Sequence, residues 1–120
     1  MTERILAIED DPGIAAVLRR GLQLAGFEVT LVGDVAGGRE AWGAGGFDLV
    51  LLDVMLPDGD GIALLSELRS TGDRTPVVLL TALEEADLRD RAQAAGASAH
   101  LAKPFAYADL LTCVRRFVAA

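Results

Sequence analysis

Three acidic residues of this chain directly follow short apolar runs and are the first candidates for chemistry. Glu9 and Asp10 come after the run at residues 5–8, and Asp53 comes after the run at residues 49–52. Carboxylates that meet in one place repel each other, and a hard divalent cation with oxygen ligands relieves the repulsion. If the fold brings these side chains together, they predict a cation site. Mg²⁺ is the ion that suits a few carboxylates beside a phosphate oxygen.

Two more residues in the same kind of position would complete a phosphoryl-transfer site. Thr81 ends the apolar run at residues 76–80, and Lys103 follows the short run at residues 99–102. A lysine supplies a compact positive charge for an anionic group, and a threonine hydroxyl can donate a hydrogen bond to it. A carboxylate beside a cation, an amine and a hydroxyl can attack phosphorus and become an acyl phosphate. We therefore expect Asp53 to accept a phosphoryl group next to Thr81 and Lys103.

Each of these residues also has an ordinary structural role that must be weighed. Acidic residues at strand ends often cap helices, Thr81 could cap the next helix, and Lys103 could be a surface charge. Asp11 is assigned to capping alone, because it stands in the N-cap position before Pro12. The joint occurrence of polar groups at four strand ends is harder to explain by capping, and it favours a site.

The elements that would position these residues alternate regularly along the chain. Short apolar runs predict five strands, at residues 5–8, 27–32, 49–53, 76–81 and 99–102. Helical patterns predict five helices, from Pro12 to a stop at Gly26, at 35–42, at 62–69, at 84–95 and from about 110 onward. This alternation predicts an α/β fold, a doubly wound five-stranded parallel sheet with helices on both faces. Ligands bind at the carboxyl ends of the strands in such sheets, so the polar residues should gather at that edge.

Two helices and one loop carry more detailed expectations. The segment at residues 55–61 is rich in Pro, Gly and Asp and should be a loop. Spacings of three and four predict that the first helix buries a face formed by Ile14, Val17, Leu18 and Leu22. The same spacings predict that the last helix buries a stripe formed by Leu110, Leu111, Val114, Phe117 and Val118.

Composition limits the class of protein. With 120 residues, of which 52% are hydrophobic, the chain suits one folded domain covering residues 1–120. No apolar run approaches the ~20 residues of a membrane span, and the N-terminus lacks the pattern of a signal peptide. Cys113 is the single cysteine, which fits a reducing, cytoplasmic location. The formal charge of −7 disfavours direct binding of nucleic acid.

Four motifs give the chain a family resemblance over essentially its whole length. They are ILAIEDD at residues 5–11, VLLDVMLPDGDG at 50–61, VVLLTA at 77–82 and AKPF at 102–105. In this order and spacing they resemble the receiver domain of two-component response regulators, and most of all the receivers of the OmpR-like winged-helix subfamily. The resemblance implies a receiver fold with strand order 2-1-3-4-5 and a signalling switch that is phosphorylated on an aspartate.

The resemblance also assigns a role to each residue of the acidic group. Asp53 corresponds to the phosphoacceptor, and Asp10 corresponds to a direct ligand of Mg²⁺, which Mn²⁺ could replace. The other ligands implied are the Asp53 carboxylate and the backbone carbonyl of Met55. Glu9 matches a second acidic position, which would reach the metal through water.

A further group of residues corresponds to the switch of the family. Thr81 matches the hydroxyl that moves toward the phosphoryl group, and Lys103 matches the lysine that pairs with it. Pro104 matches the proline that follows a cis peptide bond after Lys103. His100 stands where the family usually has an aromatic residue that changes rotamer on activation. It is either a simple amphipathic filler or a switch residue that also senses pH, because imidazole titrates near neutrality.

The same resemblance implies the partners. A sensor histidine kinase or a phosphotransfer protein would donate the phosphoryl group. The domain would catalyse only its own phosphorylation and slow dephosphorylation, and would not be a conventional enzyme. Relatives with a DNA-binding output dimerise through the fourth helix, the fifth strand and the fifth helix. No such output domain follows Ala120, so we expect either a truncated chain or a stand-alone phosphorelay or interaction module.

The expected dimer face departs from the family at two places. Ser98 and Ala99 stand where relatives usually carry two aspartates that form salt bridges across the dimer. Cys113 stands where an arginine is common, although Arg115 matches one basic position. We therefore expect a weaker or more apolar dimer through this face.

Three other functions remain open at this point. A phosphatase of the haloacid-dehalogenase type also forms an aspartyl phosphate, but it needs an acid two residues after the nucleophile, where this chain has Met55. Flavodoxin-like cofactor binding is disfavoured, because the first strand-to-helix turn is acidic and does not resemble a phosphate-binding loop. A pure interaction module would not require the intact set of site residues, which are Glu9, Asp10, Asp53, Thr81 and Lys103.

Overall fold

The main sheet of the domain has the predicted strands in the predicted order. The structure is a computed structural model and describes residues 2–82 and 86–118. The strands run parallel in the order β2-β1-β3-β6-β7, which corresponds to the expected 2-1-3-4-5 because β4 and β5 lie outside this sheet. Their bounds are β1 (Arg4–Ile8), β2 (Glu28–Val32), β3 (Leu49–Asp53), β6 (Val77–Thr81) and β7 (Ala99–Ala102). The doubly wound α/β fold is thus confirmed.

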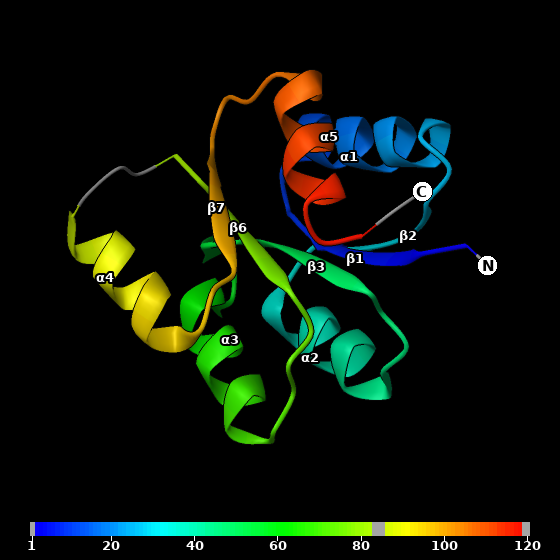
Figure 1. Ribbon diagram of the computed structural model, residues 1–120. Coiled ribbons are helices and arrows are strands. Elements are labelled where there is room, and N and C mark those ends of the chain that lie inside the picture. The colour runs from blue at the N-terminus through cyan, green and yellow to red at the C-terminus, as the bar shows by residue number, and fades with distance from the viewer. Residues whose placement is uncertain (1, 83–85, 119–120) are drawn as a thin grey trace.

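Helices cover both faces of the sheet (Figure 1). In the described part of the chain they are α1 (Pro12–Leu24), α2 (Val35–Ala44), α3 (Gly61–Ser70), α4 (Ala86–Ala95) and α5 (Tyr107–Arg115). Helices α1 and α5 pack on one face, and α2, α3 and α4 pack on the other. The predicted start of the fourth helix at Glu84 lies outside the described residues.

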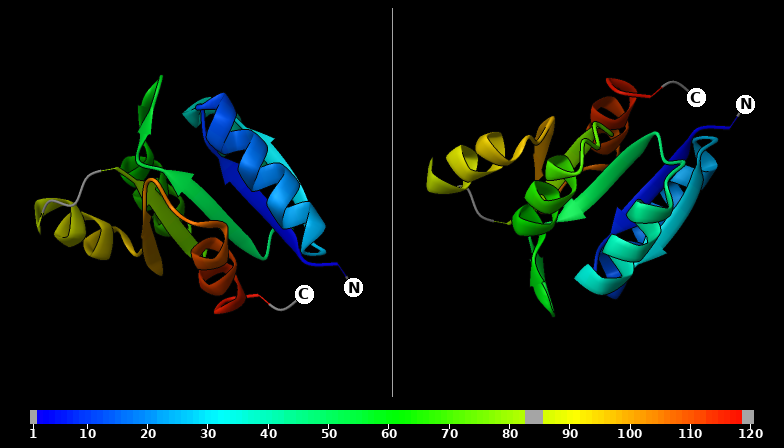
Figure 2. Two further views of the ribbon diagram at one scale, coloured as in Figure 1. Left: turned by 90° about the horizontal axis from the view of Figure 1, so that it is seen from above. Right: turned by 90° about the horizontal axis from the view of Figure 1, so that it is seen from below.

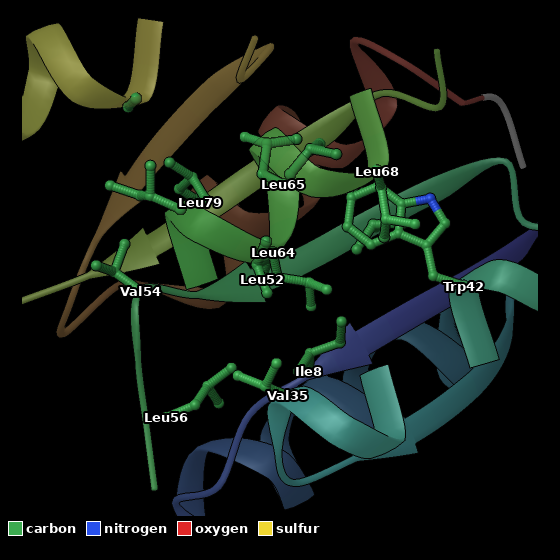
Figure 3. Packing of buried hydrophobic residues seen from close by; sticks show 14 of the residues in the cluster. Ile8, Val35, Trp42, Leu52, Val54, Leu56, Leu64, Leu65, Leu68 and Leu79 are labelled. Atoms are coloured by element: carbon green, nitrogen blue, oxygen red, sulfur yellow. The ribbon is translucent and has the colours of Figure 1, made fainter. Parts of the chain in front are cut away.

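Burial on both faces explains why the central strands are continuously apolar. Every residue of β3 and of β6 is buried. The cluster beneath α2, α3 and α4 includes Trp42, Leu52, Leu64 and Leu79, which Figure 3 shows packed together. Each fully buried side chain of this size contributes roughly 1.5–3 kcal/mol relative to exposure. The sheet is therefore a rigid frame, and its strand ends are fixed points for functional side chains.

Helix α1 buries a different face from the predicted one. Leu18 and Leu22 are fully buried, as expected, but Val17 is 51% exposed. The inward face is completed by Ala15 and Gly21, whose small size lets the helix backbone approach its neighbours closely. The prediction that Val17 belongs to the buried face was wrong. The side of α1 that carries the small residues Ala15 and Gly21 packs closely against the rest of the domain, and this turns Val17 toward solvent.

The segment after β3 is more regular than the predicted loop. Strands β4 (Met55–Leu56) and β5 (Gly59–Asp60) form an antiparallel hairpin, and Gly61 already begins α3. The green hairpin in Figure 2 projects away from the main sheet beyond β3. Leu56 is buried in the core cluster and anchors the hairpin. The prediction of a loop over the whole segment was therefore wrong, since burial of Leu56 and two backbone pairings order it.

Helix α5 is shorter than the apolar stripe suggested. It ends at Arg115, but the N–H of Val118 donates to the carbonyl of Val114 at 3.0 Å, so the chain continues to turn. Leu110, Val114 and Val118 are all buried in one core cluster. The buried stripe thus extends beyond the end of the regular helix.

Candidate functional site

The carboxyl ends of the strands bring the predicted acidic residues together. Asp53 is the last residue of β3, while Glu9 and Asp10 directly follow β1. Carboxylate oxygens of these three residues lie within 4.8 Å of one another. Asp10 is exposed, whereas Glu9 and Asp53 are buried behind it. A set of oxygen ligands that opens to solvent on one side can hold a hard divalent cation.

Lys103 is the positive charge of this cluster. Its Nζ lies 3.2 Å from Oδ2 of Asp53 and forms a still closer ion pair with Oε1 of Glu9. The side chain of Glu9 is 0% exposed, that of Asp53 is 8% exposed and that of Lys103 is 14% exposed. Charges so well shielded from water interact strongly, and loss of the single ammonium group would leave two buried carboxylates without a cation.

The main chain fixes the positions from which these side chains extend. The backbone N–H of Lys103 donates to the carbonyl of Thr81 at 2.8 Å, which joins the ends of β7 and β6. The backbone N–H of Met55 donates to Oδ1 of Asp53 at 3.3 Å. The peptide bond between Lys103 and Pro104 is cis. All the residues predicted for the phosphoryl-transfer site therefore lie at one edge of the sheet.

The buried part of the site holds two carboxylates and one ammonium group, and this arrangement shifts the pKa values of Asp53 and Lys103. Burial raises the pKa of Asp53 to about 6, together with the hydrogen bond and the negative charge of Glu9, and the charge of Lys103 opposes the shift. Burial lowers the pKa of Lys103, but its interactions with Glu9 and Asp53 outweigh burial, so that this pKa is raised. Two buried carboxylates thus share one ammonium group. An additional cation would relieve the remaining repulsion.

Thr81 and His100 line the same small cavity between α4 and the sheet. Apolar walls of this cavity include Leu79 and Leu88, and Arg89 lies at its border. Thr81 is buried at the end of β6, whereas His100 is exposed on the edge strand β7. A shift of either side chain would change the space available to the other.

Asp58 and Asp60 were not predicted as functional, yet they fasten the hairpin beside the site. The carboxylate of Asp58 accepts hydrogen bonds from the N–H groups of Val35 at 2.7 Å and Ala36 at 3.1 Å, at the start of α2. These bonds, the first of them above all, lower the pKa of Asp58. Asp60 forms an ion pair with Arg91 of α4. The sequence shows two acidic residues in a glycine-rich turn. It does not show their partners, which lie far away in the chain, so these contacts could not be predicted from the local pattern.

Among the described residues, no helix is both long enough and apolar enough to cross a membrane.

Comparison with known proteins identifies the family. A family model for the response regulator receiver domain matches residues 5–115. The swarming motility regulation protein RssB of Serratia marcescens is 40% identical over 111 residues, covering 92% of this chain and 51% of that protein. The transcriptional activator protein PfeR of Pseudomonas aeruginosa is 46% identical over 107 residues, covering 89% and 35%. The chain thus spans about half the length, or less, of these curated relatives.

A solved structure agrees with the sequence matches. The receiver domain of the sensor histidine kinase PA1611 from Pseudomonas aeruginosa, described with a magnesium ion coordinated in its active-site cleft, superposes with a TM-score of 0.88. It is 33% identical, and the match covers 98% of each chain. The regulators among the relatives also agree with the predicted resemblance to receivers of the OmpR-like subfamily. By fold, motifs and family model, the chain belongs to the response regulator receiver domain family.

Proposed function

We propose that this domain is a phosphorylation switch in which Asp53 accepts a phosphoryl group from a sensor histidine kinase or a phosphotransfer protein. The observation that carries the proposal is the cluster at the sheet edge. Three carboxylates lie within 4.8 Å of one another, and the ammonium of Lys103 pairs with two of them. Such an arrangement suits an acyl-phosphate intermediate better than a purely structural role, because buried carboxylates that repel each other destabilise a fold.

The residues present fit Mg²⁺ as the additional cation. Asp10 and Asp53 would hold it together with the backbone carbonyl of Met55, and Glu9 would act through water. Mn²⁺ would substitute, since it prefers similar oxygen ligands. When bound, Mg²⁺ would neutralise the charge on the phosphoryl oxygens during transfer. The magnesium site described for the related PA1611 receiver supports this assignment.

The residues of this chain would perform the remaining steps. An oxygen of the Asp53 carboxylate forms a bond with phosphorus while the phosphorus–nitrogen bond of a phosphohistidine breaks. The donor imidazole leaves with the electron pair and takes up a proton from solvent. Lys103, which lies 3.2 Å from Asp53, and the hydroxyl of Thr81 contact the transferred oxygens. Attack of water on the acyl phosphate later reverses the modification, so the domain turns over no substrate other than itself.

Phosphorylation would then alter the face formed by α4, β7 and α5. The phosphoryl group adds roughly −1.5 to −2 charges at pH 7, and its oxygens favour the state in which both Thr81 and Lys103 reach them. Thr81 lines the cavity that His100 also lines, so its movement makes room for the imidazole. The size of this population shift is limited by the difference in phosphoryl contacts between the two states.

This altered face would control a partner or a second copy of the domain. The transcriptional regulators among the relatives support a DNA-binding output over a stand-alone module. Three positions of this face that carry charges in the salt-bridged dimers of relatives are uncharged here, namely Ser98, Ala99 and Cys113. The hydroxyl of Ser98 accepts a hydrogen bond from the N–H of Val77 at 3.1 Å, and Cys113 is only 7% exposed. Arg115 is exposed, but Ala99 offers it no acidic partner across the dimer, which supports a weak homodimer.

Incubation with acetyl phosphate and Mg²⁺, followed by intact mass measurement, tests the proposed function. We expect the mass of one added phosphoryl group, which disappears when Mg²⁺ is chelated or when Asp53 is replaced in Asp53→Ala. An equal mass increase in Asp53→Ala would show that another residue is modified and would overturn the proposal.

A further inference from the structure

We propose that Tyr107 is a positioning residue for Lys103, and that it acts by locking the start of α5 against Gly21 of α1. The inference rests on the proposed function, because it concerns how the domain holds the lysine that meets the phosphoryl group. Nothing in the receiver motifs of the sequence points to either residue. The contact joins positions 86 residues apart.

Tyr107 contacts Gly21 both through its hydroxyl and through its ring. The hydroxyl donates a hydrogen bond to the carbonyl oxygen of Gly21 at 2.7 Å. A Cβ on Gly21 would lie 2.5 Å from Cε1 and 3.0 Å from Cδ1 of the ring, so the ring rests on the bare backbone of α1. A hydrogen bond requires a narrow range of distance and direction, so this contact restrains α5 relative to α1 more specifically than the ring alone.

Gly21 has no other evident reason to be a glycine. It lies within α1, where glycine is less favourable than alanine by about 1 kcal/mol. Its carbonyl already accepts the helical hydrogen bond from Ala25 at 3.2 Å, and the hydroxyl of Tyr107 uses the second lone pair. The close approach of the ring therefore explains the choice of residue.

The start of α5 has no side-chain cap, so the contact of Tyr107 with Gly21 is an anchor of a different kind. Ala106 stands in the N-cap position and makes no side-chain hydrogen bond to the helix. Tyr107 is the first residue of α5, so its hydrogen bond to Gly21 ties the first turn of α5 to α1. Without this tether, the uncapped first turn of α5 would be held less firmly against α1.

Only three residues separate Tyr107 from Lys103 in the chain. The other end of this segment is held by the hydrogen bond from the N–H of Lys103 to the carbonyl of Thr81. Lys103 must span Glu9 and Asp53 at once, so a small shift of the segment would weaken one of the two contacts. The acidic residues themselves directly follow β1 or end β3, and none of them lies in α5 or in the segment before it. Loss of the contact between Tyr107 and Gly21 should therefore weaken anion binding at Lys103 and leave cation binding unchanged.

Separate measurements of cation and anion affinity test this assignment. Calorimetry would give the Kd of Mg²⁺, and then the Kd of beryllofluoride at saturating Mg²⁺, for the wild type and Tyr107→Phe. The variant keeps the ring and loses the hydroxyl, and because Tyr107 is 43% exposed it should fold. We expect the Mg²⁺ affinity to be unchanged and the beryllofluoride affinity to fall by about threefold to tenfold, the range of one lost hydrogen bond.

Two further variants sharpen the test. Gly21→Ala displaces the ring without removing a hydroxyl and should reproduce the selective loss of beryllofluoride affinity. Thr112→Val removes an exposed hydroxyl from the same helix and should leave both affinities at wild-type values. Equal weakening of both ligands in Tyr107→Phe would indicate a general loosening of the domain and would overturn the assignment, as would an unchanged beryllofluoride affinity. A wild-type protein that binds neither ligand would instead refute the proposed function itself.

Discussion

Gly61, the first residue of α3, lies directly against the backbone of Asp53. A Cβ on Gly61 would be 2.1 Å from the carbonyl oxygen of Asp53, well inside any tolerable contact. The N–H of Gly61 also donates to the carbonyl of Val54 at 2.7 Å. The helix therefore begins at the end of the strand with no space for a side chain between them, and the position of the candidate phosphoacceptor depends on that glycine.

Replacement of this glycine should destabilise the domain. Gly61→Ala forces the backbone of Asp53 or of α3 to move, which we expect to lower the free energy of unfolding by about 1–3 kcal/mol or more. Urea denaturation followed by the fluorescence of Trp42, the only tryptophan, measures the effect. Gly43→Ala is the matched control, since a Cβ there meets nothing within 4 Å and alanine favours the helix. Similar stabilities of the two variants would contradict the steric argument.

The stability of the metal-free domain should depend on the ionisation of Asp53. Its pKa is raised from 3.8 to about 6 in the folded state, so the unfolded state releases this proton first as the pH rises. The contribution of Asp53 to stability is therefore greatest below pH 3.8 and is lost as the pH rises through about 6. Asp53→Asn should stabilise the metal-free protein by roughly 1–3 kcal/mol at pH 7.5 and by little at pH 4.

Urea denaturation with a chelator present, at both pH values, provides the measurement. Addition of Mg²⁺ should stabilise the wild type at pH 7.5 and have much less effect on Asp53→Asn. A variant that is less stable than the wild type at pH 7.5 would show that burial and the charge of Glu9 do not dominate at this position.

Loss of the buried ammonium should be more damaging than loss of the whole ion pair. Lys103→Met leaves Glu9 and Asp53 buried without a cation, and we expect a loss of about 3–5 kcal/mol at pH 7.5. The loss should be smaller at pH 5, where the carboxylates can take up protons. The double variant Glu9→Gln/Lys103→Met also removes the charge of Glu9, one of the two unpaired carboxylates, and should recover part of the lost stability. Equal losses in the single and double variants, in chemical denaturation, would argue against this electrostatic explanation.

His100 should make the response of the switch sensitive to pH. A protonated imidazole enters an apolar cavity bordered by Arg89 less readily than a neutral one, because burial of a charge is costly. We expect the beryllofluoride affinity of the wild type, divided by that of His100→Phe, to be lower at pH 6 than at pH 8. The ratio cancels the titration that both proteins share at Asp53. A ratio that does not change between the two pH values would reject the role of His100 in sensing pH.

Self-association should be weak and insensitive to salt. The face formed by α4, β7 and α5 lacks the acidic residues that relatives use, as Ser98 and Ala99 occupy their positions. Sedimentation velocity of the beryllofluoride-loaded protein in low and high salt should show a similar small fraction of dimer. A tight dimer that dissociates as salt is added would mean that salt bridges form elsewhere on this face.

The sheet and the site at its edge could be predicted because short stretches of sequence reveal them. The strands that contain Leu51 and Leu79 are buried on both faces, so their apolar runs are continuous and end where the chain meets solvent. Asp53 and Thr81 stand at those ends, and the rule that ligands bind at the carboxyl edge of a parallel sheet then brings them together.

Other features could not be predicted because they depend on partners far away in the sequence. Val17 fits the helical spacing of the buried face as well as Leu18 does, and only tertiary contacts, such as that of Tyr107 with Gly21, show which side faces inward. Asp58 looks like any acidic turn residue until the start of α2 is placed beside it. Contacts of this kind follow from tertiary packing, which periodicity along one element does not contain.

The hairpin of β4 and β5 is held on both of its flanks, by Asp58 at the N-terminus of α2 and by Asp60 through Arg91 of α4. This has a practical meaning for anyone who wants to build a biosensor from the domain. A fluorescent module or peptide tag inserted into this turn would disturb its contacts with two helices at once, close to the aspartate whose phosphorylation such a sensor would report.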